Sequence, residues 1–89
     1  MKTIWQKLNE NTIEEEFTPE FHTEGKICRC LREMRDRESD VLRFRFALPG
    51  YSFRTLKELA LHYDVSSENI RQREAKGIRQ LRWLLRNMK

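Results

Sequence analysis

Polar side chains recur in the last third of the chain at spacings that place them on one helix face. The stripe consists of Ser67, Glu68, Arg71, Gln72 and Lys76, which fall at i, i+1, i+4, i+5 and i+9. Gln72 can pair bidentately with adenine, Arg71 can reach guanine or a phosphate, and Glu68 can accept from the amino group of cytosine. The stripe therefore predicts a helix that reads double-stranded DNA in the major groove.

Basic residues around this stripe suit contacts to phosphates, which position a protein on DNA without reading its sequence. Arg54, Lys76 and Arg79 fit that role. For any single arginine, a solvated helix face is at least as good an explanation. The stripe as a whole favours DNA because its charge, the adjoining turn and the helix cap agree.

The stripe needs a helix to present it, and the sequence predicts a helix-turn-helix. Thr55 and Glu58 have the spacing of a capping box, which opens a helix. A short polar turn follows, in which Ser66 can cap a second helix that runs to near Met88, interrupted only by Gly77. Ala60 is small where the two helices would cross. The expected inward positions are Leu56, Leu59, Ala60, Val65 and Ile70, and further along Ile78, Leu81, Leu84, Leu85 and Met88.

Two more helices are expected immediately upstream. Apolar residues from Ile27 to Met34 share one face, and the pattern resumes from Val41 to Leu48 after a polar break at residues 35–37. Leu48, Pro49 and Gly50 then predict a turn. Nearer the start, residues 1–17 suggest a short amphipathic helix with weak end signals. Thr18 and Pro19 predict another helix start, which Gly25 interrupts or ends.

Composition agrees with an all-α fold, a small helical bundle with a long C-terminal recognition helix. The chain has 89 residues, enough for one small domain, with 36% charged residues, three Gly and two Pro. Residues 1–24 carry two Lys and six Glu, a net charge of −4, whereas residues 25–89 carry +8. We therefore separate an acidic segment, residues 1–25, from a basic domain, residues 26–89, whose charge suits a phosphate backbone.

Several classes of function are not expected. The chain has no long apolar run, so we expect neither a signal peptide nor a membrane span, and a cytoplasmic location. Cys28 and Cys30 are then reduced thiols, and with His22 and His62 isolated no metal site is predicted. No phosphate loop or catalytic triad is present, so we expect neither an enzyme nor a cofactor.

Three stretches resemble region 4 of bacterial sigma factors, the promoter-reading C-terminal domain. Residues 37–46 resemble the family's R-E-x-x-V-L-R-x-R-F, and residues 55–60 resemble T-L-E-E-(I/V)-(G/A). Residues 64–76 resemble V-(S/T)-R-E-R-(I/V)-R-Q-I-E-x-K. The resemblance extends from about Ile27 to Arg82 and is nearer the housekeeping type than the extracytoplasmic type.

The resemblance implies a compact helical domain that places its recognition helix in the −35 promoter element. Glu68, Arg71 and Gln72 match positions that read bases or enter the groove, and Arg37, Arg45 and Lys76 match backbone contacts. It also implies a cleft for the flap tip of the RNA polymerase β subunit. By position that cleft would involve Ile27, Leu31, Leu42, Phe46 and Leu56, for which core packing is an equally good explanation.

The chain also departs from the family pattern. Ser67 stands where an Arg usually reads guanine, a difference of about 1–3 kcal/mol at that base pair, and Asn69 replaces another basic residue. Arg73 replaces an apolar residue, so we expect it to snorkel or to meet a carboxylate. Gly77 replaces Ala at a cost of about 1 kcal/mol.

Nothing in the first 26 residues resembles the promoter-melting region, so the chain alone is not expected to open a promoter. We expect a small natural protein that helps at the promoter, with half of a split sigma factor or a cut-down fragment as alternatives. A different function remains open: a protein-interaction module for the polymerase flap, or for an anti-sigma or co-sigma partner, that reads no DNA.

Three further hypotheses concern the ends of the chain. Trp83 could contact a partner protein, although we expect it to pack against the N-terminal segment. The long last helix and the apolar N-terminal residues also allow self-association. Finally, the acidic segment could lie over the basic reading surface and inhibit it.

Overall fold

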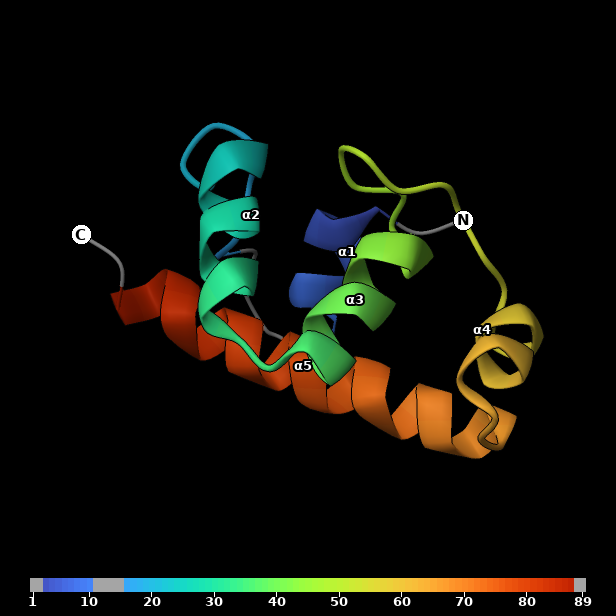
Figure 1. Cartoon of the computed structure of the whole chain (residues 1–89). Helices are drawn as coiled ribbons and strands as arrows, with labels where there is room; N and C mark the ends of the chain where they lie inside the picture. The colour runs from blue at the N-terminus through green and yellow to red at the C-terminus, as the bar shows by residue number, and fades with distance from the viewer. Residues whose placement is uncertain (1–2, 11–15, 88–89) are drawn as a thin grey trace.

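Five helices make up the regular structure of residues 3–10 and 16–87, the part of the chain that the computed structural model describes. They are α1 (Ile4–Leu8), α2 (Glu24–Glu33), α3 (Asp36–Arg45), α4 (Leu56–Tyr63) and α5 (Ser67–Asn87) (Figure 1). No strand occurs within these ranges. The prediction of an all-α bundle with a long C-terminal helix is confirmed.

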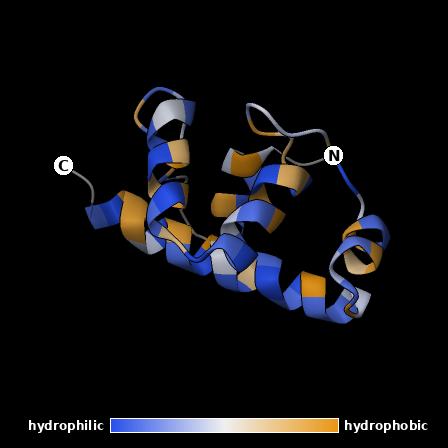
Figure 2. Ribbon diagram, in the orientation of Figure 1, coloured by the Kyte–Doolittle hydropathy of each residue, from blue (hydrophilic) through white to orange (hydrophobic). Residues whose placement is uncertain are grey.

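Helix α5 runs along the whole molecule, and each of the other helices packs against it (Figure 1). Its hydrophobic residues recur along a ribbon that is otherwise hydrophilic (Figure 2). Ile70, Ile78, Leu81 and Leu85 are buried as predicted, and Leu84 is half-buried. Met88, the last predicted member of this face, lies outside the described residues.

Buried side chains form two clusters along α5. The larger cluster joins α1, α2 and α3 to the C-terminal half of α5; it includes Ile4, Leu8, Phe17, Ile27, Cys30, Leu31, Met34, Leu42, Leu48, Ile78, Leu81 and Leu85. The smaller cluster consists of Val41, Leu59, Ala60 and Ile70. This smaller cluster fixes α4 and the start of α5 to α3, so it sets the geometry of the helix-turn-helix.

Gly77 lies where α3 packs tightly on α5. A Cβ atom at this position would stand 3.1 Å from Leu42 Cδ1 and 3.3 Å from Glu38 Cβ. Such distances are tighter than ordinary van der Waals contact. The glycine that the sequence places in mid-helix therefore lets α3 lie directly on the α5 backbone.

Most of the predicted helix ends are confirmed. Helix α4 begins with the Thr55 capping box, and Ser66 Oγ accepts from the Asn69 amide at 3.0 Å at the start of α5. The turn before α4 contains Gly50 with φ +89°, a conformation that favours glycine. Helix α3 starts directly after Arg35, inside the predicted polar break.

The N-terminal predictions need correction. Thr18 and Pro19 begin only a single turn, closed by the His22 amide on the Thr18 carbonyl at 2.8 Å. The Thr18 hydroxyl is buried without a partner and caps nothing. Thr23 caps α2 instead, by accepting from the Lys26 amide, and Gly25 lies inside that helix rather than ending it.

Helix α1 is shorter and better capped than the sequence suggested. It covers only Ile4–Leu8, and Thr3 and Gln6 form a reciprocal capping box. Residues 11–15, part of the expected helix, lie outside the described residues. Beyond them Phe17 is fully buried in the main core.

No helix in the described ranges is both long enough and apolar enough to cross a membrane.

Candidate nucleic-acid interface

The turn between α4 and α5 is closed by backbone and side-chain hydrogen bonds. Asp64 ends α4 in the left-handed conformation, with φ 55° and ψ 50°, and the Val65 amide donates to the Ala60 carbonyl at 3.0 Å. Ile70, fully buried against Leu59 and Ala60, turns one face of α5 inward. The opposite face of α5 is thereby fixed toward solvent.

The predicted reading residues lie on that outward face. Ser67, Glu68, Arg71, Gln72 and Lys76 are all exposed. Arg79 is exposed on the same helix, two turns beyond Gln72. The structure thus presents all five side chains of the stripe at the surface of one helix, beginning at its first residue.

Glu68 and Arg71 form an ion pair within the stripe. The Arg71 Nε donates to Glu68 Oε2 at 2.8 Å, and Arg71 Nη2 donates to Glu68 Oε1 at 2.6 Å. These bonds hold the pKa of the Glu68 carboxyl below its ordinary value, and a bond from Gln72 adds to the effect. Two of the predicted base readers therefore bind each other in the protein without DNA.

Arg73 does not enter the core. Its guanidinium lies over the ring of Tyr63 on α4, 5.6 Å from the ring centroid. A cation over an aromatic face is a favourable contact, and Arg73 is half-buried in this position. The partner of Arg73 is therefore an aromatic ring, which neither of the two expected arrangements, snorkelling or a carboxylate partner, included.

The predicted phosphate contacts divide into two groups. Arg37, Lys76 and Arg79 are exposed. Arg45 and Arg54 are half-buried and engaged within the protein. Arg45 pairs with Glu74 at 3.5 Å and donates to the Arg54 carbonyl at 3.3 Å, while the Arg54 guanidinium lies 4.8 Å from the centroid of a phenylalanine ring.

Lys76 is exposed yet partly neutralised. Its Nζ lies 3.6 Å from Oε1 of Glu38 on α3; the side chains are 58% and 6% exposed, respectively. The buried carboxylate keeps the ammonium near α3. Lys76 can still present its charge to a phosphate at the flank of the reading helix.

The five residues expected to line a polymerase cleft do not share one surface. Ile27, Leu31 and Leu42 are fully buried in the main core, so core packing accounts for them. Phe46 and Leu56 are half-buried at the edges of the two clusters. Only these two are accessible for contact with a partner.

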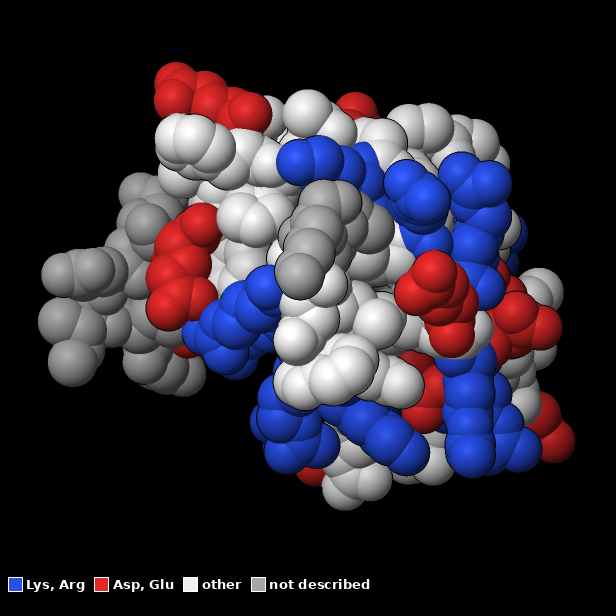
Figure 3. All heavy atoms as spheres, turned by 90° about the vertical axis from the view of Figure 1, so that its left-hand side faces the viewer, with Lys and Arg blue, Asp and Glu red and all other residues white. Residues whose placement is uncertain are grey.

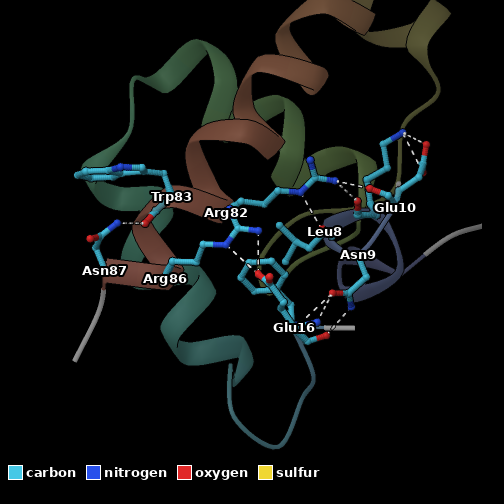
Figure 4. A network of polar contacts seen from close by, with 10 residues as sticks. Leu8, Asn9, Glu10, Glu16, Arg82, Trp83, Arg86 and Asn87 are labelled. Atoms are coloured by element: carbon cyan, nitrogen blue, oxygen red, sulfur yellow. Dashed lines mark hydrogen bonds and ion pairs between the residues drawn. The ribbon is translucent and has the colours of Figure 1, made fainter. Parts of the chain in front are cut away.

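The N-terminal segment binds the C-terminal half of α5 through polar contacts that the sequence analysis missed. The Arg82 guanidinium donates to the carbonyls of Leu8, Lys7 and Glu10, at 2.7, 3.0 and 3.1 Å. Arg86 pairs with Glu16 at 2.8 Å (Figure 4). No local signal could have shown these bonds, because they join residues about 70 positions apart. The described part of the acidic segment thus packs on the C-terminal half of α5, and its Lys7 and Glu10 line a pocket together with Ala75 and Arg79.

Trp83 is 63% exposed, which corrects the expectation that it packs against the N-terminal segment. It extends away from Leu8, Asn9 and Glu10 (Figure 4). Phe17 and Leu8 occupy the core position instead, fully buried beneath α5. A large indole on the outer face of α5 is therefore left uncovered.

Basic side chains are not confined to the reading stripe. The end of the molecule formed by α2 and the last turns of α5 also carries Lys and Arg, interspersed with acidic groups (Figure 3). Among the described residues, no group of three His, Cys, Asp or Glu side chains is placed to hold a metal ion. Cys28 and Cys30 are both free thiols.

Comparison with known proteins adds two findings. Residues 30–82 match the protein family described as Sigma-70, region 4. RNA polymerase sigma factor SigA of Clostridium acetobutylicum is 41% identical over 64 residues, which are 72% of this chain but only 17% of that protein. The chain thus corresponds to a small part of this relative. No solved structure matches significantly.

Proposed function

The chain belongs to the sigma-70 region 4 family, and from this premise we propose that it is a DNA-binding domain for transcription initiation. It reads a promoter element of the −35 type in the major groove and contacts RNA polymerase, in the cytoplasm. The observation that carries the proposal is the exposed polar stripe at the start of α5, fixed outward by a capped helix-turn-helix.

Each part of the stripe has a task in this proposal. The first turns of α5 enter the groove, where Gln72 and Glu68 meet base edges. Arg37, Lys76 and Arg79 flank them with exposed charges that suit phosphates. Arg45 and Arg54 stabilise the fold, since their guanidinium groups are already engaged.

Ser67 affects which DNA sequence the domain prefers. A serine can bond to several bases, whereas the Arg common at this position in the family selects guanine. We expect a preference that differs from the usual −35 hexamer at the base pair facing Ser67. Replacing Ser67 by Arg should raise discrimination for guanine there by about 1–3 kcal/mol.

Selection of bound sequences from random DNA, with and without RNA polymerase, tests the function. We expect one enriched motif and an affinity that falls steeply with salt. Gln72→Ala should relax preference at one base pair, by about 1–3 kcal/mol. Arg79→Ala should weaken binding to all sequences alike and lower the salt slope by about 0.9.

Arg32→Ala is the matched control, because Arg32 is exposed on α2, on another part of the molecule. It should leave the enriched motif unchanged. Salt-independent binding, or no enrichment with or without polymerase, would reject DNA reading.

Polymerase contact is proposed at the two accessible residues of the expected cleft. Phe46 and Leu56 are half-buried, so a partner could cover them without unfolding the core. Phe46→Ala should weaken capture by the isolated β flap and leave DNA binding unchanged. Equal capture of variant and wild type would remove this contact.

One observation favours a second function, a protein-interaction module that reads no DNA. The outward Trp83 is the kind of side chain that anchors protein interfaces. A polymerase fragment, an anti-sigma or co-sigma protein, or a second copy of the chain would bury it. This second function predicts that Trp83→Ala abolishes capture of the partner, whereas Arg71→Ala and Gln72→Ala leave that capture unchanged.

A further inference from the structure

The ion pair on the reading surface joins two residues that would both contact DNA. Glu68 and Arg71 are bound to each other through two parallel bonds, at 2.6 and 2.8 Å. Both side chains are more than half exposed. A guanidinium held side-on by a carboxylate in this way has two of its five donors occupied and its charge balanced.

We propose that the Glu68–Arg71 pair is a lock on the reading surface, which withholds Arg71 from phosphates until Glu68 meets its own base. The inference rests on the proposed function of DNA reading. On DNA without a suitable base, Glu68 finds no donor and stays with Arg71. Where a cytosine amino group faces Glu68, the carboxylate accepts from it and Arg71 is released to a phosphate or to guanine.

The lock makes Glu68 a specificity residue in two ways. It reads cytosine directly, and it removes one cation from the contacts that bind any DNA sequence. Because sequence-independent affinity comes from such phosphate contacts, masking one of them lowers binding to wrong sites more than to the right one. Specificity then rises without an added contact.

Glu68→Gln tests the lock, since glutamine keeps the shape of the side chain and loses the charge. We expect the variant to bind random DNA about fivefold more tightly at low salt, with a salt slope steeper by about 0.9. Its preference for cytosine at the base pair facing residue 68 should fall. Glu33→Gln makes the same charge change on α2 and should alter neither the slope nor the preference.

A double-mutant cycle separates the lock from simple charge repulsion. In an Arg71→Gln background, Glu68→Gln should no longer change the salt slope, because no cation remains to be released. Repulsion between Glu68 and DNA would instead persist in that background. An unchanged slope after Glu68→Gln in the wild-type background, or the same slope change in both backgrounds, would overturn the lock.

A titration of the free protein by NMR provides an independent readout. The pKa of Glu68 should lie below its ordinary value and return to it in Arg71→Gln. An ordinary pKa in the wild type would show that the pair does not form and would overturn the lock. Absence of DNA binding in every variant would reject the proposed function itself, whereas DNA binding that meets none of these expectations would reject the lock alone.

Discussion

Individual arginines in this domain differ in how much freedom their surroundings leave them, and that difference decides what each can do. Arg45 is paired with Glu74 and lies over the ring of Phe53, 5.5 Å from its centroid. Arg79 is exposed on the outer face of α5. Both arginines were predicted to contact phosphates, because the sequence shows the charge of a side chain but not the residues that it contacts in the fold.

Arg45→Ala should therefore mainly lower stability, whereas Arg79→Ala should mainly weaken DNA binding. Removal of Arg45 leaves the largely buried Glu74 carboxylate without its cation. Side chains that are 23% and 11% exposed keep some solvent screening, so we expect a loss of about 2 kcal/mol, below the 3–5 kcal/mol typical of fully buried pairs. Arg79→Ala should change stability by about 0.5 kcal/mol or less and weaken DNA binding. Urea denaturation and a DNA titration of both variants check this pair.

His22 gives the fold a pH dependence. Burial, aided by the nearby Lys26 charge, lowers the pKa of its imidazole below the ordinary 6.5. Its Nδ1 is buried without a partner, and its ring lies 5.1 Å from that of Phe17. The unfolded chain therefore binds a proton at a higher pH than the folded protein does. The free energy of unfolding should fall as pH drops through 6.5 toward the lowered value.

Urea midpoints measured between pH 7.5 and pH 5.5 test this dependence. His22→Gln should flatten the profile in that window. His62→Gln, a change at the exposed histidine of α4, should leave the profile as in the wild type. A flat wild-type profile would contradict the expected role of His22.

At the scale of elements, the sequence predicts the four helices from α2 onward far better than the segment that precedes them. Helices α4 and α5 carry strong local start signals, such as the Thr55 capping box and the Ser66 cap, and the Gly50 turn precedes them. Thr18 carries an equally clear signal and yet starts only one turn. Tertiary contacts prevail there, because the Trp5 indole donates to the His22 carbonyl at 3.0 Å and fixes the chain where a helix would continue.

In the candidate site too, features set by neighbouring residues were predictable and contacts between distant elements were not. Periodicity and capping were enough to predict which face of α5 is exposed, because both act over a few residues. The ion pairs of Lys76 with Glu38 and of Arg45 with Glu74 were not predictable, since they depend on how α3 crosses α5. Gly77 was the one visible sign of that crossing.

The two helical glycines offer a matched test of the crossing. Gly77→Ala gains about 1 kcal/mol of helix propensity, yet its Cβ must displace Leu42 and Glu38 from 3.1 and 3.3 Å. Overpacking typically costs about 1–3 kcal/mol, so we expect a net loss of about 1 kcal/mol. Gly25→Ala meets nothing closer than 3.8 Å and should stabilise by up to about 1 kcal/mol. Thermal unfolding of both variants measures the difference; equal stabilisation would mean that α3 does not lie on Gly77.

At the scale of the whole molecule, the N-terminal segment belongs to the same core as the family domain. Ile4, Leu8 and Phe17 are buried against α5 and α2. Arg82 bonds to three carbonyls at the end of α1, where a cation is favourable. A division at residue 25 by charge therefore does not describe a division in packing, and the segment has a structural task that its acidity concealed.

Deleting residues 1–22 distinguishes this structural task from inhibition of DNA binding. The truncated chain keeps Thr23 to cap α2 but loses the buried Ile4, Leu8 and Phe17, each worth about 1.5–3 kcal/mol. Their sum is comparable to the whole stability of a small domain, about 5 kcal/mol or somewhat more. We expect broad, non-cooperative unfolding and weaker DNA binding.

Arg82→Gln in the full chain, which removes the bonds to α1 and keeps the core, should lower stability more mildly and leave the DNA preference unchanged. Cooperative unfolding of the truncated chain together with tighter DNA binding would show instead that the segment covers the reading surface.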